Sequence, residues 1–92
     1  MDGEKRYYTY ILRCSDGTLY TGYAADPMLR AQAHNAGKGA KYTRARLPVT
    51  LVYTECFCSR GAAQRREAQI KQLSRAQKLL LVEQHREPPG GD

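Results

Sequence analysis

A β-hairpin signal near the N-terminus constrains the fold of this chain more than any other feature. The segments Tyr7–Arg13 (YYTYILR) and Thr18–Tyr23 (TLYTGY) are rich in aromatic and β-branched side chains, which is typical of strands. Between them lies CSDGT, and its Asp16-Gly17 dipeptide favours a tight turn. We therefore expect two antiparallel strands that pair directly with each other.

The next segment carries the start and stop signals of a helix. Asp26 can cap a helix N-terminus, Pro27 suits the first helical position, and Gly37 can end the helix. These signals predict a helix from Pro27 to Ala36. The following stretch, Gly37–Pro48 (GKGAKYTRARLP), indicates a basic loop that can hold a short helical turn.

A third strand and two further helices complete the pattern. Val49–Cys58 has strand composition, Arg60–Leu73 is typical of a helix, and Ser74 with Gln77 forms a capping box for a last helix. The order ββα-β-αα predicts an α+β fold with a small three-stranded, mostly antiparallel sheet flanked by helices. We expect residues 1–85 to form one domain and residues 86–92 (REPPGGD) to form a disordered tail.

The length and charge of the chain limit its class. Its 92 residues suffice for one domain with a small core. Fifteen Lys and Arg against nine Asp and Glu give a net charge of +6, which indicates an anionic partner, nucleic acid before an acidic membrane. No apolar run is long enough to cross a bilayer, and the N-terminus lacks the apolar core of a signal peptide. We therefore expect a cytoplasmic protein without a membrane partner.

The three cysteines do not form a recognisable metal or disulfide pattern. Cys56 and Cys58 are two positions apart in a strand-like run, where a disulfide is geometrically poor. A structural zinc site would need four ligands. We expect Cys14, Cys56 and Cys58 to be buried free thiols.

Two tyrosines of the expected hairpin are the first candidate site residues. With a strand period of two, Tyr8, Tyr10 and Leu12 share one face, as do Tyr20 and Gly22 on the return strand. If the hairpin brings these faces together, Tyr10 and Tyr20 lie near each other. Gly22 would then let the chain turn away closely. Packing alone would also explain tyrosines in strands.

The helix after the hairpin adds an arginine and a histidine one turn apart. A period of 100° per residue predicts an apolar stripe of Leu29, Ala33 and Ala36. Arg30 lies at the edge of this stripe, where it would be half-buried with its guanidinium over the sheet, and His34 lies just beyond. The alternatives are a snorkelling surface arginine and a surface or hydrogen-bonded histidine.

Glu67 is a further candidate residue, after the tyrosines, the arginine and the histidine. It falls between Ala63 and Ile70, at the border of an apolar helix face, with Arg65 and Arg66 beside it. It could form a salt bridge on a solvated helix, or it could be a ligand for a hard divalent cation. Taken with the tyrosines, the arginine, the histidine and the basic loop, it suits attack of water on a phosphodiester.

These residues resemble the motifs of the GIY-YIG nucleases. The YIG element is similar to Tyr20–Gly22 (YTG), and a degenerate GIY element is similar to Tyr8–Tyr10 (YTY), in which only the final tyrosine is kept. The helix arginine of the family falls on Arg30, and its metal-binding glutamate falls on Glu67 in RREAQIKQLSR. Small stand-alone bacterial members also carry a run like His34–Arg44 (HNAGKGAKYTR).

The resemblance implies hydrolysis of DNA phosphodiesters with one divalent metal ion, in DNA repair or processing. Glu67 would hold Mg²⁺ or Mn²⁺, and Tyr20, or Tyr10 acting with it, would accept a proton from the attacking water. Arg30 would balance phosphoryl charge, and His34 would position water or phosphate, or relay a proton. The basic residues that would contact the backbone are Lys38, Lys41 and Arg44.

Other functions fit the same sequence. The chain could be a non-catalytic or weakly catalytic module that binds DNA or RNA, or an interaction protein whose basic face docks an acidic protein. A unit of this size has little room for a separate recognition domain, so a homodimer or a protein partner is also consistent with it.

Overall fold

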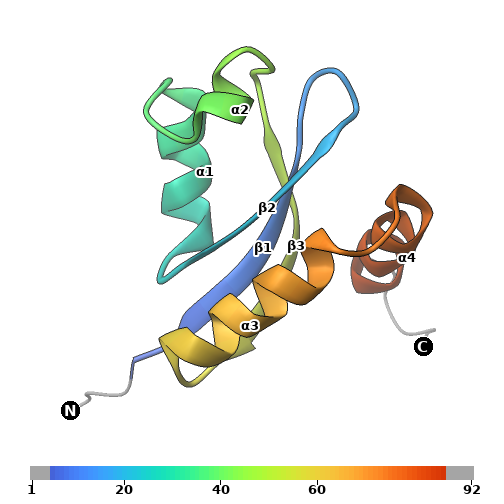
Figure 1. Cartoon of the computed structure of the whole chain (residues 1–92). Coiled ribbons are helices and arrows are strands. Elements are labelled where there is room, and N and C mark those ends of the chain that lie inside the picture. The colour runs from blue at the N-terminus through green and yellow to red at the C-terminus, as the bar shows by residue number, and fades with distance from the viewer. Residues whose placement is uncertain (1–4, 87–92) are drawn as a thin grey trace.

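The computed structural model describes residues 5–86 and contains the predicted order of elements (Figure 1). The elements are β1 (Tyr7–Arg13), β2 (Leu19–Ala24), α1 (Pro27–Asn35), α2 (Lys41–Arg44), β3 (Thr50–Phe57), α3 (Arg60–Lys71) and α4 (Arg75–Arg86). The α+β fold class is confirmed, and the helical turn in the basic loop is the short helix α2. From residue 87 onward, the predicted tail lies outside the described residues.

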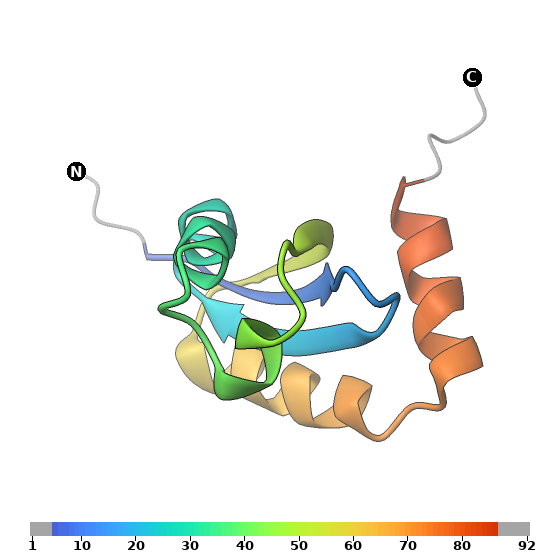
Figure 2. The same ribbon diagram turned by 90° about the horizontal axis from the view of Figure 1, so that it is seen from above.

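The sheet has the order β2-β1-β3, with β1 antiparallel to both neighbours. On one face, Tyr10, Leu12 and Ala31 of α1 belong to one core cluster. On the other face, Ile11 packs with Ile70 of α3 and with residues of α4 in a second cluster. Figure 2 shows α1 and α3 on opposite sides of the sheet. The central strand therefore contributes to both cores.

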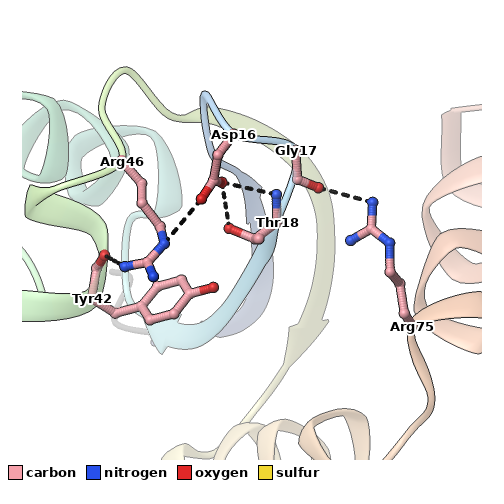
Figure 3. Close-up of polar contacts among 6 residues, drawn as sticks. All are labelled: Asp16, Gly17, Thr18, Tyr42, Arg46 and Arg75. Atoms are coloured by element: carbon pink, nitrogen blue, oxygen red, sulfur yellow. Dashed lines mark hydrogen bonds and ion pairs between the residues drawn. The ribbon is translucent and has the colours of Figure 1, made fainter.

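The hairpin turn forms as its sequence predicts and also joins distant elements. Gly17 has a φ of +86°, a conformation that glycine adopts without a steric cost. Asp16 Oδ1 accepts hydrogen bonds from the backbone N–H and the hydroxyl of Thr18, at 3.0 and 2.6 Å. Arg46 forms an ion pair with Asp16 at 3.1 Å, and Arg75 at the start of α4 donates to the Gly17 carbonyl (Figure 3).

Helix α1 begins and ends where the sequence predicts. Asp26 caps the backbone N–H of Leu29 at 3.1 Å. At the other end Gly37, with a φ of +79°, donates to the His34 carbonyl, and the next N–H donates to the Ala33 carbonyl. This pair of bonds is a Schellman motif, which satisfies carbonyls at the helix end.

The predicted buried stripe of α1 is wrong. Leu29 is 61% exposed, and Ala36 is exposed as well. The buried residues are instead Pro27, Ala31 and His34, which recur at spacings of four and three on a different face of the helix. A polar histidine can take this interior position because its ring nitrogens have hydrogen-bond partners there, so hydropathy alone misplaces the face.

The expectation for the cysteines is only partly correct. All three are free, but only Cys14 is buried, whereas Cys56 and Cys58 are exposed. Cys56 lies near the end of β3, and Cys58 lies just after this strand, before α3. Further along, Ser74 and Gln77 form the predicted capping box, with bonds of 2.9 and 3.1 Å between side chain and backbone.

Candidate active site

His34 lies between the two candidate tyrosines. Its side chain is completely buried, with its ring centroid 6.4 Å from that of Tyr10 and 5.3 Å from that of Tyr20. The Tyr10 hydroxyl is 3.3 Å from His34 Nε2. β1 supplies Tyr10, β2 supplies Tyr20 and α1 supplies His34, so three elements meet at this imidazole.

Thr43 of α2 determines the tautomer of this imidazole. The Thr43 hydroxyl donates its proton to the Ala40 carbonyl at 2.9 Å, so it accepts from the N–H at His34 Nδ1, 2.8 Å away. A longer contact of 3.4 Å from the Ala40 N–H to Nδ1 would need the other tautomer. With the proton on Nδ1, the Nε2 lone pair accepts from the Tyr10 hydroxyl.

Two glycines make room for this arrangement. Gly22 stands opposite Tyr10 in the β1–β2 ladder, and a Cβ there would lie 2.7 Å from the Tyr10 hydroxyl oxygen. Strand β2 continues past Gly22 to Ala24, so its role is to accommodate the Tyr10 ring and not to turn the chain. A Cβ on Gly39 would overlap with the imidazole of His34.

Several candidate residues affect the pKa of the Tyr10 hydroxyl. Burial raises the pKa of Tyr10 to about 12, and Tyr20 and the Glu67 carboxylate act in the same direction. A hydrogen bond from Arg30 and its positive charge oppose the rise in this pKa. Arg30 is more exposed than predicted, and its effect on this pKa does not cancel the effect of burial. Tyr10 thus stays protonated near neutral pH.

His34 has a shifted pKa as well. Burial lowers the pKa of His34, and the Arg30 charge lowers it further, so the imidazole is neutral at pH 7. A neutral imidazole with a free Nε2 can accept a proton from the Tyr10 hydroxyl.

The lowered pKa of His34 predicts a pH-dependent stability. Because the folded pKa lies below the ordinary value of 6.5, the unfolded chain binds the proton first as the pH falls. The stabilising contribution is complete above about pH 6.5 and is lost as the pH falls toward the folded pKa. We expect the Tm from circular dichroism to decrease between about pH 7.5 and 5.5, and His34→Gln to reduce this decrease. The exposed His85→Gln is the matched control, and equal slopes in all three proteins would contradict the assignment.

Glu67 lies on α3 with a side chain that is 18% exposed. Its carboxylate pairs with Lys71 Nζ at 2.9 Å, whereas the adjacent Arg66 pairs with Glu55 at 2.9 Å. Across residues 5–86 there is no cluster of three or more potential metal ligands. One partly exposed carboxylate fits Mg²⁺ or Mn²⁺, which proteins often bind through one or two carboxylates together with waters and substrate phosphates.

The three predicted backbone-binding residues, Lys38, Lys41 and Arg44, are all exposed and lie in or beside α2. They share this segment with Thr43, which holds His34. The short helix therefore brings basic side chains near the candidate site and also supports it.

Sequence reasoning missed an aromatic stack on Tyr20. The Tyr42 ring stacks on Tyr20 with centroids 6.1 Å apart, and the Arg46 guanidinium lies 3.9 Å from the centre of the Tyr42 ring. Arg46 also donates to the Tyr42 carbonyl and pairs with Asp16 (Figure 3). The alternation of aromatic and basic residues in KYTRAR was the available signal, but only the fold shows that it packs against Tyr20.

The comparisons with known proteins agree with this geometry. The model of the GIY-YIG catalytic domain matches residues 6–79, which is most of the chain. A small antiparallel sheet with the two tyrosine elements on its hairpin defines the same class. The chain therefore belongs to the GIY-YIG family, a nuclease superfamily.

Within this family the chain is similar to proteins named UPF0213. The Streptococcus agalactiae protein is 58% identical over 79 residues, covering 86% of this chain and 90% of that protein. The Halobacterium salinarum protein is 61% identical over 75 residues, covering 82% and 97%. Since the latter organism is an archaeon, the group is not confined to bacteria.

Two solved structures are similar to this chain. The UPF0213 protein BH0048 of Bacillus halodurans has a TM-score of 0.59 and 48% identity, covering 90% of this chain and 88% of its own. The protein EF2693 of E. faecalis has a TM-score of 0.59 and 41% identity, covering 100% and 99%. Both were solved by NMR in solution, and they support the α+β fold.

Proposed function

We propose that this chain is a divalent-metal-dependent endonuclease that hydrolyses phosphodiester bonds in DNA, in repair or processing in the cytoplasm. In residues 5–86 no helix is both long and apolar enough to cross a bilayer. The proposal rests on the observation that several candidate residues surround or influence one hydroxyl group, that of Tyr10. Tyr10 Oη lies 3.3 Å from His34 Nε2, and its pKa is lowered by Arg30 and raised by Glu67. These four residues come from β1, α1 and α3.

Glu67 is the residue that would hold Mg²⁺ or Mn²⁺. When bound there, the ion would stabilise the negative charge that develops on the leaving oxygen. Lys71 neutralises the same carboxylate in the absence of metal, which keeps a partly buried charge paired. Lys71 and a divalent cation would therefore compete for Glu67.

The proton of the attacking water would leave through Tyr10 or Tyr20. With a pKa of about 12, Tyr10 is a poor base by itself. It can, however, pass its own proton to the Nε2 of neutral His34 as it takes one from water. The bond from His34 Nδ1 to Thr43 keeps the imidazole in the tautomer that this relay requires.

The basic residues would bind the phosphate backbone. Arg30 can present a planar pair of donors to phosphoryl oxygens beside Tyr10. Lys38, Lys41 and Arg44 would add contacts that do not depend on sequence. The same charges support the alternative function, a nucleic-acid-binding module without strong catalysis. The ion pair between Glu67 and Lys71 favours this alternative, because it already neutralises the carboxylate that would bind the metal.

A cleavage panel tests the proposal. Labelled single-stranded DNA, duplex DNA, flap DNA and RNA are incubated with the protein and Mg²⁺ or Mn²⁺, with and without EDTA. We expect cleavage of at least one DNA substrate and its complete loss in EDTA, because one carboxylate cannot activate the phosphate without the ion. Binding with a steep salt dependence but no cleavage of any substrate would favour the binding module. Cleavage that persists in EDTA would exclude the metal-dependent scheme.

A further inference from the structure

A depression of about 390 Å³ adjoins the candidate site and shares Arg30 with it. Its walls include Tyr7, Tyr23, Arg30 and Arg60. A second depression of about 440 Å³ shares Tyr7 and Arg60 and adds Lys5 and Arg6. In Figure 1 the starts of β1, α1 and α3 lie at the same end of the sheet. We call this surface the tyrosine–arginine surface.

The aromatic rings of this surface are held by neighbouring side chains. The Tyr23 hydroxyl accepts a hydrogen bond from Gln64 Nε2 at 3.0 Å, which ties β2 to α3. The Arg60 guanidinium lies 5.4 Å from the centre of the Tyr7 ring, within the range of a cation–π contact. Rings that are fixed in advance lose little entropy when a ligand packs against them.

The chemistry of the surface suits a nucleotide with an unpaired base. No acidic side chain is present among the described residues that line the two depressions, while Arg30, Arg60 and Lys5 supply positive charge. Basic side chains attract phosphate, and tyrosine rings provide a face on which a base can stack. In a duplex the base faces are covered by their neighbours, so stacking of this kind selects unpaired strands. The volume also falls within the range of about 300–1,000 Å³ that small-molecule sites have.

We propose that the tyrosine–arginine surface binds an unpaired nucleotide of a nucleic-acid strand, by stacking of its base on Tyr7 or Tyr23 and by contact of its phosphate with Arg60. Arg30 belongs both to this surface and to the surroundings of the Tyr10 hydroxyl, so the bound nucleotide lies beside the site of the proposed cleavage. This inference rests on the proposed nuclease function. It specifies the substrate as nucleic acid with a single-stranded segment next to the cleaved bond.

Binding in EDTA tests this inference separately from cleavage. Fluorescence anisotropy is measured with labelled oligo-dT, oligo-rU and a DNA duplex of the same length. We expect Tyr7→Ala to weaken binding of the single strands about 5- to 150-fold and to leave duplex binding within about twofold of wild type. Tyr7→Phe, which keeps the ring, should bind like wild type. The oligo-dT and oligo-rU arms show whether DNA or RNA supplies the nucleotide.

Arg60→Ala provides a second variant at an exposed position, and it tests the phosphate contact. We expect the slope of log K against log salt to fall by about 0.7 for single strands. Lys78→Ala, which removes a charge near the hairpin end of the sheet, should leave Tyr7-dependent stacking intact. Wild-type affinity for single strands in both Tyr7→Ala and Arg60→Ala would overturn the inference. So would an equal loss for single strands and duplex in Tyr7→Ala. Tyr7-dependent binding without any metal-dependent cleavage would instead refute the proposed nuclease function and leave the surface intact.

Discussion

Replacing Glu67 with glutamine should abolish metal-dependent cleavage while leaving nucleic-acid binding largely intact. The amide keeps the shape of the side chain but removes the negative charge that would hold the cation. Loss of a partner in the outer shell of a metal typically costs about 10–100-fold in activity, so loss of the single protein ligand should exceed that range. The measurement compares single-turnover cleavage rates and anisotropy of wild type and Glu67→Gln. Glu83→Gln on the exposed side of α4 is the matched control.

Lys71→Ala should act in the opposite direction at the same carboxylate. The Glu67–Lys71 pair has an i,i+4 spacing on α3, and such pairs are worth about 0.3–0.5 kcal/mol. Its removal should lower the metal concentration for half-maximal cleavage roughly twofold, since 1.4 kcal/mol corresponds to tenfold. Full cleavage by Glu67→Gln, or a metal requirement that rises in Lys71→Ala, would contradict the role given to Glu67.

The substitution Gly39→Ala should destabilise the domain and disturb the site together. The added methyl group would overlap with the His34 ring, which is held on its other sides by Tyr10 and Thr43. Overpacking of a buried position typically costs about 1–3 kcal/mol. For a domain of this size each kcal/mol lowers Tm by about 4–8 °C, so we expect a decrease of at least about 4 °C.

The control for this substitution is Gly61→Ala. A Cβ on Gly61 would meet only the Arg65 side chain, at 3.5 Å, and alanine is the better helix former inside α3. Gly61→Ala should therefore keep or raise Tm, whereas Gly39→Ala lowers both Tm and the cleavage rate. An unchanged Tm in Gly39→Ala would show that the contact between Gly39 and His34 does not restrict the packing of this ring.

Much of the fold could be predicted because its signals are local. The Asp16-Gly17 turn, the Asp26 cap and the capping box of Ser74 each act within a few residues, so their effects are visible in the sequence itself. The element bounds agree to within two residues for the same reason. The buried face of α1 could not be predicted, since His34 is buried by bonds to Tyr10 and Thr43, which lie on other elements.

The candidate site shows the same division between local and distant effects. The spacing of Tyr10, Tyr20, Arg30 and Glu67 identified the candidate residues and the family, because the order and spacing of motif residues are visible in the sequence alone. The stack of Tyr42 on Tyr20 and the tyrosine–arginine surface were missed, since each joins segments that the sequence leaves far apart.

By itself, the sequence determined the order of strands and helices, the basic charge and the set of candidate site residues. Only the tertiary structure decided how these residues meet. Antiparallel pairing set Gly22 opposite Tyr10 and so opened the space for its ring, and α2 brought Thr43 to the far side of His34. The physical reason is that hydrogen-bond geometry and steric fit depend on distances between elements, whereas turns, caps and charge depend on neighbours along the chain.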